Sequence, residues 1–179
     1  ARMSSSTPEN PSDARQPAAS GGWQVLVIDD EADIREILQM VLEDAGFGVQ
    51  TAADGEAGIS LCEDSPPHIV ITDIRMPGMD GLAVLEQLKS RQPDIEVIVI
   101  TAFSDMDVAI RALQLDASDF ITKPINEAAL HVALSRARDR YTAKEEMREY
   151  TALLEQQNAR TLRELIESHS FRDKLIEYS

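Results

Sequence analysis

The sequence has a single cysteine, few aromatic residues and no long apolar run. One cysteine among 179 residues, Cys62, excludes a disulfide framework and a cysteine-based zinc finger, and it suits a reducing compartment. No apolar stretch approaches the roughly 20 residues that a membrane-spanning helix needs. The first residues show no charged-then-apolar secretory leader. We therefore expect a soluble, cytoplasmic protein that makes no contact with a membrane.

Basic residues are also scarce. The chain has 17 Lys and Arg against 32 Asp and Glu, for a net charge of −15. The excess is concentrated in residues 23–126, which hold six basic and twenty acidic residues, whereas residues 127–179 hold nine and ten. An acidic block of this size repels phosphate backbones, so we expect no direct nucleic-acid binding by this chain. The same block would attract a divalent cation.

Residues 1–22 are rich in Ser, Pro, Ala and Gly and lack apolar periodicity, which predicts a disordered N-terminal tail. Five apolar segments follow, and amphipathic stretches with helical spacing separate them. Because three of the five are nearly continuous runs of Val and Ile, we expect parallel strands covered on both faces. The alternation predicts an α/β domain with a doubly wound five-stranded parallel sheet over residues 23–140. The expected strands are 24–28, 48–52, 68–72, 95–100 and 119–122.

The residues from Asn126 to Ser179 include no Pro or Gly, which predicts one long helix capped by Asn126. Its first turns should pack on the sheet as the fifth helix of the domain. Residues 141–179 carry an imperfect heptad stripe, which favours a coiled-coil linker and a parallel homodimer over a single solvated helix. A buried Asn158 could fix the register of such a coil. The stripe is formed by Met147, Leu154, Thr161 and Leu175, with Thr151, Asn158 and Leu165 beside them.

Polar side chains follow four of the expected strands. In a doubly wound sheet these strand ends meet at one edge, where ligands bind. Clustered carboxylates repel one another by about 4 kcal/mol per pair at 4 Å and an effective dielectric constant near 20. Oxygen ligands of this kind suit Mg²⁺, so we expect a magnesium site at this edge. The residues are Asp29, Asp30 and Glu31 after the first strand, Asp73 after the third, Thr101 after the fourth and Lys123 after the fifth.

This set of residues suits phosphoryl transfer. A metal held by Asp30 and Asp73 leaves one Asp73 oxygen as a nucleophile toward phosphorus, and the product is an aspartyl phosphate. Lys123 and Thr101 could neutralise the phosphoryl oxygens. Each residue also has an ordinary structural interpretation: Asp30 or Asp33 could cap the first helix, Thr101 the fourth, and Lys123 could be a surface lysine. The convergence of four strand ends favours the shared chemistry.

Four motifs carry a family resemblance, and together they span residues 23–126. This region resembles a two-component response-regulator receiver domain, which implies a flavodoxin-like fold. It also implies phosphorelay signal transduction, with a histidine kinase or a phosphotransfer protein as the partner. The motifs are VIDDE at Val27–Glu31, TDIRMPGMDG at Thr72–Gly81, ITA at Ile100–Ala102 and DFITKP at Asp119–Pro124.

The resemblance also assigns roles to individual residues. It implies that Asp73 is the phosphoacceptor, that Thr101 and Lys123 bind the phosphoryl oxygens, and that Phe120 is an aromatic switch coupled to Thr101. It implies a cis peptide bond between Lys123 and Pro124. The implied ligands of Mg²⁺ are the side chains of Asp30 and Asp73, the backbone carbonyl of Arg75, and Asp29 through water.

The sequence departs from the family at one turn, because Asp116 stands where similar receivers have Gly before the fifth strand. Residues 141–179 resemble the signalling helices that join receivers to output domains, so we expect the chain to be the N-terminal part of a larger signalling protein. An alternative is the regulatory part of a larger enzyme, such as a sensor histidine kinase with a PAS domain, a phosphatase or a cyclic-nucleotide enzyme. A phosphohydrolase of haloacid dehalogenase type is disfavoured, because Arg75 replaces the required second Asp.

Overall fold

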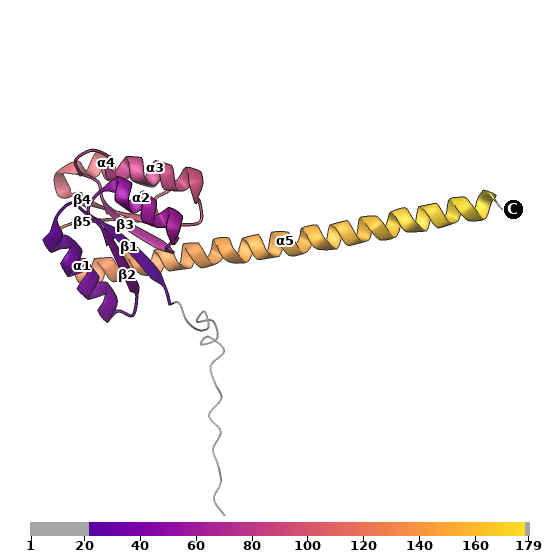
Figure 1. Ribbon diagram of the computed structural model, residues 1–179, viewed down its shortest axis with the longest axis horizontal. Helices are drawn as coiled ribbons and strands as arrows, with labels where there is room; N and C mark the ends of the chain where they lie inside the picture. Colours follow the sequence, from indigo (N-terminus) through magenta and orange to yellow (C-terminus); the bar gives the residue numbers. More distant parts are fainter. Residues whose placement is uncertain (1–21, 178–179) are drawn as a thin grey trace, which may run out of the picture.

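The computed structural model describes residues 22–177, so the predicted tail over residues 1–22 lies outside the described residues except for Gly22. Five parallel strands form one sheet in the order β2-β1-β3-β4-β5 (Figure 1). This order confirms the predicted doubly wound α/β fold. The strands are β1 (Gln24–Ile28), β2 (Gly48–Ala52), β3 (Ile69–Asp73), β4 (Glu96–Ala102) and β5 (Asp119–Lys123).

The strands are Val- and Ile-rich because both faces of the sheet are covered. Leu26, Ile28 and Val97 point to a core shared with α2 (Gly55–Asp64), α3 (Gly81–Arg91) and α4 (Met106–Gln114). Val25, Val27 and Ile98 point to a second core, shared with α1 (Ala32–Asp44) and α5 (Glu127–Glu177). Figure 1 shows α2, α3 and α4 together on one face, with α1 and α5 on the other. Successive side chains of a strand point to opposite faces, so each run fills both cores.

The helix starts differ from one another in how they are capped. Asp54 and Asp80 accept hydrogen bonds from backbone N–H groups in the first turns of α2 and α3, at 2.7 and 2.8 Å. The residue before α1 is Glu31, and its side chain makes no capping bond. Capping of the first helix by Asp30 or Asp33 is therefore wrong, and Asp30 remains available to the strand edge.

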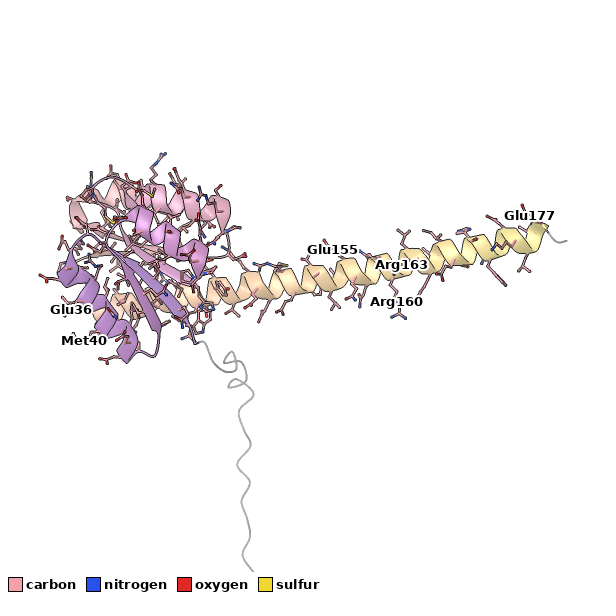
Figure 2. The ribbon with its side chains drawn as sticks, viewed as in Figure 1. Glu36, Met40, Glu155, Arg160, Arg163 and Glu177 are labelled. Atoms are coloured by element: carbon pink, nitrogen blue, oxygen red, sulfur yellow. The ribbon has the colours of Figure 1, made fainter. Side chains whose placement is uncertain are left out.

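Helix α5 is 51 residues long, about 75 Å at 1.5 Å per residue. Asn126 caps it by accepting a hydrogen bond from the backbone N–H of Ala129 at 3.1 Å, as predicted. Its buried residues end at Ala137, and every residue from Glu145 to Glu177 is exposed. Figure 2 shows the side chains of this distal part projecting on all sides, away from the domain. No helix within residues 22–177 combines the length and hydropathy needed to cross a bilayer.

A row of basic residues at intervals of four attaches α5 to the amino edge of the sheet. Glu96, the first residue of β4, is fully buried, and its carboxylate lies 2.7 Å from Lys144 and 3.3 Å from Arg140. On either side, two more basic residues of the row pair with aspartates. These are Arg136 with Asp119, at 3.1 Å, and Arg148 with Asp94.

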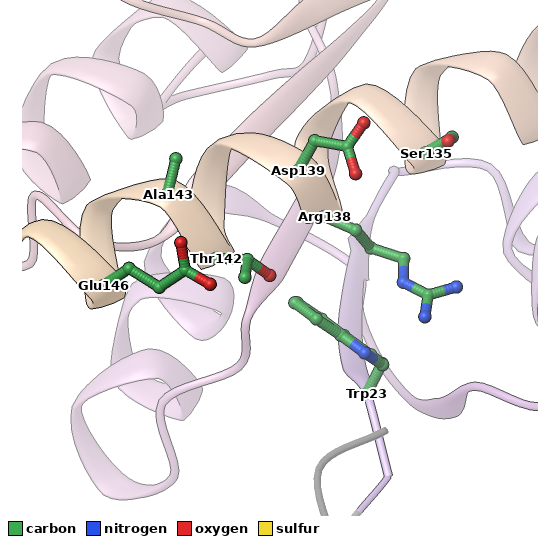
Figure 3. Close-up of a pocket in the computed structure, with 7 residues that line it drawn as sticks. All are labelled: Trp23, Ser135, Arg138, Asp139, Thr142, Ala143 and Glu146. Atoms are coloured by element: carbon green, nitrogen blue, oxygen red, sulfur yellow. The ribbon is translucent and has the colours of Figure 1, made fainter. Parts of the chain in front are cut away.

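An aromatic cluster holds the same part of α5. The ring centroids of Trp23 and His68 lie 5.4 and 5.0 Å from that of Tyr141. The Arg138 guanidinium lies 5.1 Å from the centre of the Trp23 ring, and Figure 3 shows the two side chains side by side at a shallow pocket on α5. These contacts, together with the ion pairs, fix α5 on the domain beyond its last buried residue.

The implied cis peptide bond is present, and the turn at Asp116 keeps a backbone conformation typical of Gly. The peptide bond between Lys123 and Pro124 is cis. Asp116, in the turn before β5, has a φ of 73°, the left-handed conformation in which Gly is otherwise favoured. Asp tolerates this conformation better than most residues do. Its carboxylate is also anchored, 2.6 Å from Arg140 on α5.

Candidate functional site

Three carboxylates meet at the carboxyl edge of the sheet, as the strand ends predicted. Asp29 and Asp30 follow β1, and Asp73 is the last residue of β3. Each offers one oxygen to a group in which all the oxygens lie within 4.8 Å of one another. The neighbouring positions of β1 and β3 in the sheet bring together residues more than 40 positions apart in the sequence.

Asp29 is the carboxylate with the least compensation. Its side chain is fully buried, and one oxygen accepts a hydrogen bond from the backbone N–H of Glu31 at 2.9 Å. The other oxygen has no hydrogen-bond partner among residues 22–177. Burial, helped by the charge of Asp73, raises the pKa of Asp29 to about 6, against the opposing effect of the Glu31 hydrogen bond.

Lys123 is the cation of the site. Its ammonium donates a hydrogen bond to one oxygen of Asp73 at 3.0 Å. Burial alone would lower the pKa of Lys123, but the hydrogen bond to Asp73 and the surrounding carboxylates outweigh it, so the pKa lies above its ordinary value. The lysine is therefore charged, and it holds Asp73 in a fixed orientation.

The remaining predicted residues lie around Asp73 without binding it through their side chains. Thr101 is buried in β4, and its hydroxyl donates to the carbonyl of Ala102 at 3.2 Å. It does not cap α4, whose cap position is Asp105. The backbone N–H of Arg75 lies 3.4 Å from the second Asp73 oxygen. Phe120 is half-buried in β5 and packs against the core under α2, α3 and α4.

The sequence did not point to the side-chain pair formed by Arg75 and Asp105. The Arg75 guanidinium donates two hydrogen bonds to the Asp105 carboxylate, at 3.0 and 2.8 Å. These hydrogen bonds hold the pKa of Asp105 below its usual range. The two residues are 30 positions apart, and an Asp before a helix is usually a cap, so no local pattern marks the pair.

The donor set fits a hard divalent cation. Mg²⁺ prefers carboxylate and carbonyl oxygens and keeps part of its water shell. Here three clustered carboxylates face a single lysine, and one buried Asp29 oxygen lacks a partner among the described residues. A cation among these oxygens would offset the burial and, to a smaller extent, the repulsion from Asp73 that together raise the pKa of Asp29.

Comparison with known proteins identifies the family. Residues 25–135 match the response regulator receiver domain family. The transcriptional regulator NtrC of Salmonella typhimurium, a DNA-binding protein by its name, is 38% identical over 124 residues. That match covers 69% of this chain and 26% of NtrC. The chain thus spans about a quarter of the length of the curated relatives it matches.

Solved receiver structures have the same fold. A response regulator receiver protein from Clostridium thermocellum is 30% identical, with a TM-score of 0.64, over 70% of this chain and 98% of that one. The receiver domain of NtrX from Brucella abortus is 35% identical, with a TM-score of 0.61, over 63% of this chain and 96% of that one. These two matches cover nearly the whole of each solved domain.

Proposed function

The chain belongs to the response regulator receiver domain family of two-component systems, and we propose that Asp73 is the residue on which it accepts a phosphoryl group. One observation carries the assignment. Asp73 is the only one of the three clustered carboxylates with a hydrogen bond from a lysine, at 3.0 Å, within the described residues. That contact places the charge needed to stabilise a phosphoryl oxygen beside the attacking carboxylate.

Phosphoryl transfer then follows from the positions of the side chains. An Asp73 oxygen attacks the phosphorus of a phosphohistidine on a kinase or phosphotransfer protein, the P–N bond breaks, and the imidazole leaves with the electron pair. Lys123 stays charged and can move its hydrogen bond from the carboxylate to a phosphoryl oxygen. Thr101 can turn its hydroxyl from the Ala102 carbonyl to another oxygen.

Mg²⁺ is the cation that we propose for this edge. Asp30, Asp73 and the Arg75 carbonyl would hold it, and Asp29 would act through a bound water. When bound, it supplies positive charge to the phosphoryl oxygens in the transition state. Asp29 lies on the buried side of the site, where its unpartnered oxygen could accept a hydrogen bond from a water. In this proposal Phe120 changes position together with Thr101.

Intact-mass measurement after incubation with acetyl phosphate tests the assignment. With Mg²⁺ we expect one phosphoryl adduct, which is absent in EDTA and absent from Asp73→Asn. Asp80→Asn is a matched control, because it alters an exposed aspartate seven residues away that caps α3. An adduct that persists in Asp73→Asn would refute the assignment of Asp73, and no adduct with Mg²⁺ would refute the phosphoacceptor function.

We also propose that the distal part of α5 carries the phosphorylation state to an output domain as a parallel dimeric coil. Apolar side chains on one stripe of this helix are 40–65% exposed, which is costly unless they are covered. The stripe follows an imperfect heptad repeat, in which residues seven apart lie on nearly the same face of the helix. Its rows are Met147, Leu154 and Thr161, with Thr151, Asn158 and Leu165 beside them.

A second copy of the chain fits this stripe, because a parallel pair places identical residues opposite each other. Apolar layers then face apolar layers, and Asn158 faces Asn158, which can exchange side-chain hydrogen bonds and fix the register. A heptad repeat predicts a left-handed pair. The ion pairs of Arg140 and Lys144 with the domain would transmit movements of the receiver into this pair.

Sedimentation equilibrium tests the dimer. We expect the chain to dimerise and Leu154→Glu to shift it toward the monomer. Leu153→Glu is the matched control, because this neighbour is also exposed but lies about 100° away around the helix. Equal loss of dimer in both variants, or a monomer in the wild type at high concentration, would contradict the coil.

The comparisons favour a regulator over the enzyme alternative, because the first curated relatives are named as transcriptional regulators. Their names describe DNA binding by proteins about four times as long as the part matched here. We propose that this chain itself does not bind DNA, because residues 23–126 carry twenty acidic and six basic residues. The partner we propose for this domain is the phosphorylated histidine protein.

A further inference from the structure

Two loops at the mouth of the site are joined by one ion pair. Arg75 lies in the loop between β3 and α3, and Asp105 ends the short 3₁₀ turn η2 (Phe103–Asp105) before α4. The guanidinium binds both carboxylate oxygens, at 3.0 and 2.8 Å. Two parallel hydrogen bonds of this kind fix orientation as well as distance. Phosphoryl transfer as described above uses neither side chain.

The backbone of Asp105 also contacts Thr101. The Thr101 hydroxyl lies within hydrogen-bonding distance of the Asp105 backbone carbonyl, at 3.4 Å. Asp105 therefore contacts both the residue two positions after Asp73 and the hydroxyl expected to move to the phosphoryl group. If Thr101 turns toward Asp73, it gives up this bond.

The Asp105 carboxylate is in an unusual position for its place in the chain. Asp105 is the cap residue of α4, where an Asp side chain normally accepts a hydrogen bond from the first turn of the helix. Here it makes no capping bond, although Asp54 and Asp80 do so at α2 and α3. Its side chain, only 17% exposed, is instead turned to Arg75. The carboxylate thus has two alternative partners, of which this structure shows one.

We propose that Asp105 is a positioning residue that holds Arg75 and Thr101 away from the unphosphorylated Asp73, and that phosphorylation releases it to cap α4. The inference rests on the proposed phosphoacceptor function of Asp73. A phosphoryl group brings a charge of about −1.5 to −2, more than the single charge of Asp105, and it competes for the guanidinium. The backbone N–H of Arg75 lies 3.4 Å from an Asp73 oxygen, so the guanidinium belongs to a residue next to the new charge.

The release has a direct structural consequence. Once Asp105 leaves Arg75 and caps the first turn of α4, the start of this helix is re-formed on different hydrogen bonds. Thr101 then loses one of its two acceptors, the Asp105 carbonyl, at the same moment that the phosphoryl group offers another. Asp105 couples the chemistry at Asp73 to the position of α4, because it binds Arg75 in one arrangement of the loop and caps α4 in the other.

Calorimetric titration with beryllium fluoride, a phosphoryl mimic, in excess Mg²⁺ tests this proposal. The measured affinity depends on the equilibrium between Asp105 bound to Arg75 and Asp105 capping α4. Asp105→Asn keeps a side chain that caps helices well but loses the charge that holds Arg75. A ligand that favours the released arrangement then binds more tightly, because less of its binding free energy is used to break the pair. We expect roughly a twofold to fivefold gain in affinity, the range of an exposed ion pair.

A double-mutant cycle with Arg75→Gln tests whether Asp105 acts through its ion pair with Arg75, which we call the latch, or through a local effect of its own. In the Arg75→Gln background Asp105→Asn should change the affinity by less than about 1.5-fold, because the pair is already broken. Asp105→Ala, which removes both the ion pair and the cap, should gain less than Asp105→Asn. Glu36→Gln, which removes one exposed negative charge on α1, is the charge-matched control and should leave the affinity unchanged.

The outcomes distinguish the two proposals. If Asp105→Asn gains the same affinity in both backgrounds, or gains none in the wild type, the latch is wrong while the phosphoacceptor assignment stands. If the wild-type protein does not bind beryllium fluoride, or Asp73→Asn binds it equally well, the proposed function is wrong and the latch falls with it.

Discussion

Asp29 and Glu96 are both fully buried carboxylates, but they lie at opposite edges of the sheet and have opposite surroundings. At the amino edge two basic residues of α5 compensate Glu96. At the carboxyl edge Asp29 has carboxylates as neighbours, and one of its oxygens has no partner among residues 22–177. The amino edge neutralises its buried carboxylate with two cations, although neither Glu96 oxygen accepts a hydrogen bond among the described residues. The carboxyl edge stores unfavourable negative charge, which a bound cation can relieve.

The strongest test of this contrast is to remove the charge at the carboxyl edge. Asp29→Asn should stabilise the protein by about 2–3 kcal/mol at pH 7.5 in EDTA, because the raised pKa of Asp29 makes its ionised form costly. A group whose folded-state pKa is raised contributes stability below pH 3.8 and loses it as the pH rises through about 6. Urea unfolding should therefore show the two proteins converging below about pH 4. If Asp29→Asn has a lower free energy of unfolding than the wild type at pH 7.5, ionised Asp29 does not destabilise the protein and this explanation is wrong.

The same kind of substitution at the amino edge should have the opposite effect. Glu96→Gln leaves Arg140 and Lys144 without their buried partner. Removal of one member of a fully buried pair costs about 3–5 kcal/mol, and we expect about 1–3 kcal/mol here because the two cations are 35% and 34% exposed. Urea unfolding followed by the fluorescence of Trp23, the single tryptophan, measures the loss.

The matched control for Glu96→Gln is Glu63→Gln. Glu63 pairs with Arg91 at 2.6 Å, but both side chains are more than half exposed. Its loss should cost less than about 0.5 kcal/mol. Equal effects of the two substitutions would mean that burial does not distinguish the amino edge.

Acidification gives a further test of the difference between the two edges, with a smaller expected change in the free energy of unfolding. Burial lowers the pKa of His68, and its Nδ1 accepts a hydrogen bond from the backbone N–H of Gln24 at 2.9 Å, which requires that nitrogen to be unprotonated. Stability from a neutral histidine is fully present above pH 6.5 and is lost as the pH falls below that value and through the lower pKa of the folded state. Acid therefore weakens the amino edge while it relieves Asp29.

Unfolding of wild type and His68→Gln between pH 5 and pH 7.5 isolates this contribution. The wild type should lose more stability than the variant on acidification. Parallel pH profiles would show that His68 does not contribute. The size of the effect depends on how closely Trp23 and Tyr141 enclose the ring, with centroids 4.7 and 5.0 Å away.

The sequence predicted the carboxyl edge better than the amino edge, for a physical reason. Asp29, Asp73 and Lys123 each follow an apolar strand, so the period of the strands and the parallel topology are enough to bring them together. Glu96 and Arg140 meet only because α5 crosses the start of β4, and nothing local to either residue marks that contact.

The alternative caps show the same limit. The sequence offered Asp30 and Asp33 as caps of the first helix, but α1 starts after Glu31 without a side-chain bond. It also offered Thr101 as a cap of the fourth helix, but the cap position is Asp105, and the Asp105 carboxylate is turned to Arg75. A residue that is suitable for a cap can be taken by a stronger partner from another loop, and this competition depends on tertiary structure.

The most direct measurement is a Mg²⁺ titration of the thermal midpoint in wild type, Asp30→Asn and Asp33→Asn. Asp33→Asn is the control, because it removes the same charge from the exposed first turn of α1. At Mg²⁺ ten times above its dissociation constant, the wild type and Asp33→Asn should gain about 1.4 kcal/mol, a rise of roughly 3–6 °C, and Asp30→Asn much less. A wild-type midpoint that does not respond to Mg²⁺, or an Asp30→Asn midpoint that rises as far as the wild type, would contradict a cation site at the carboxyl edge.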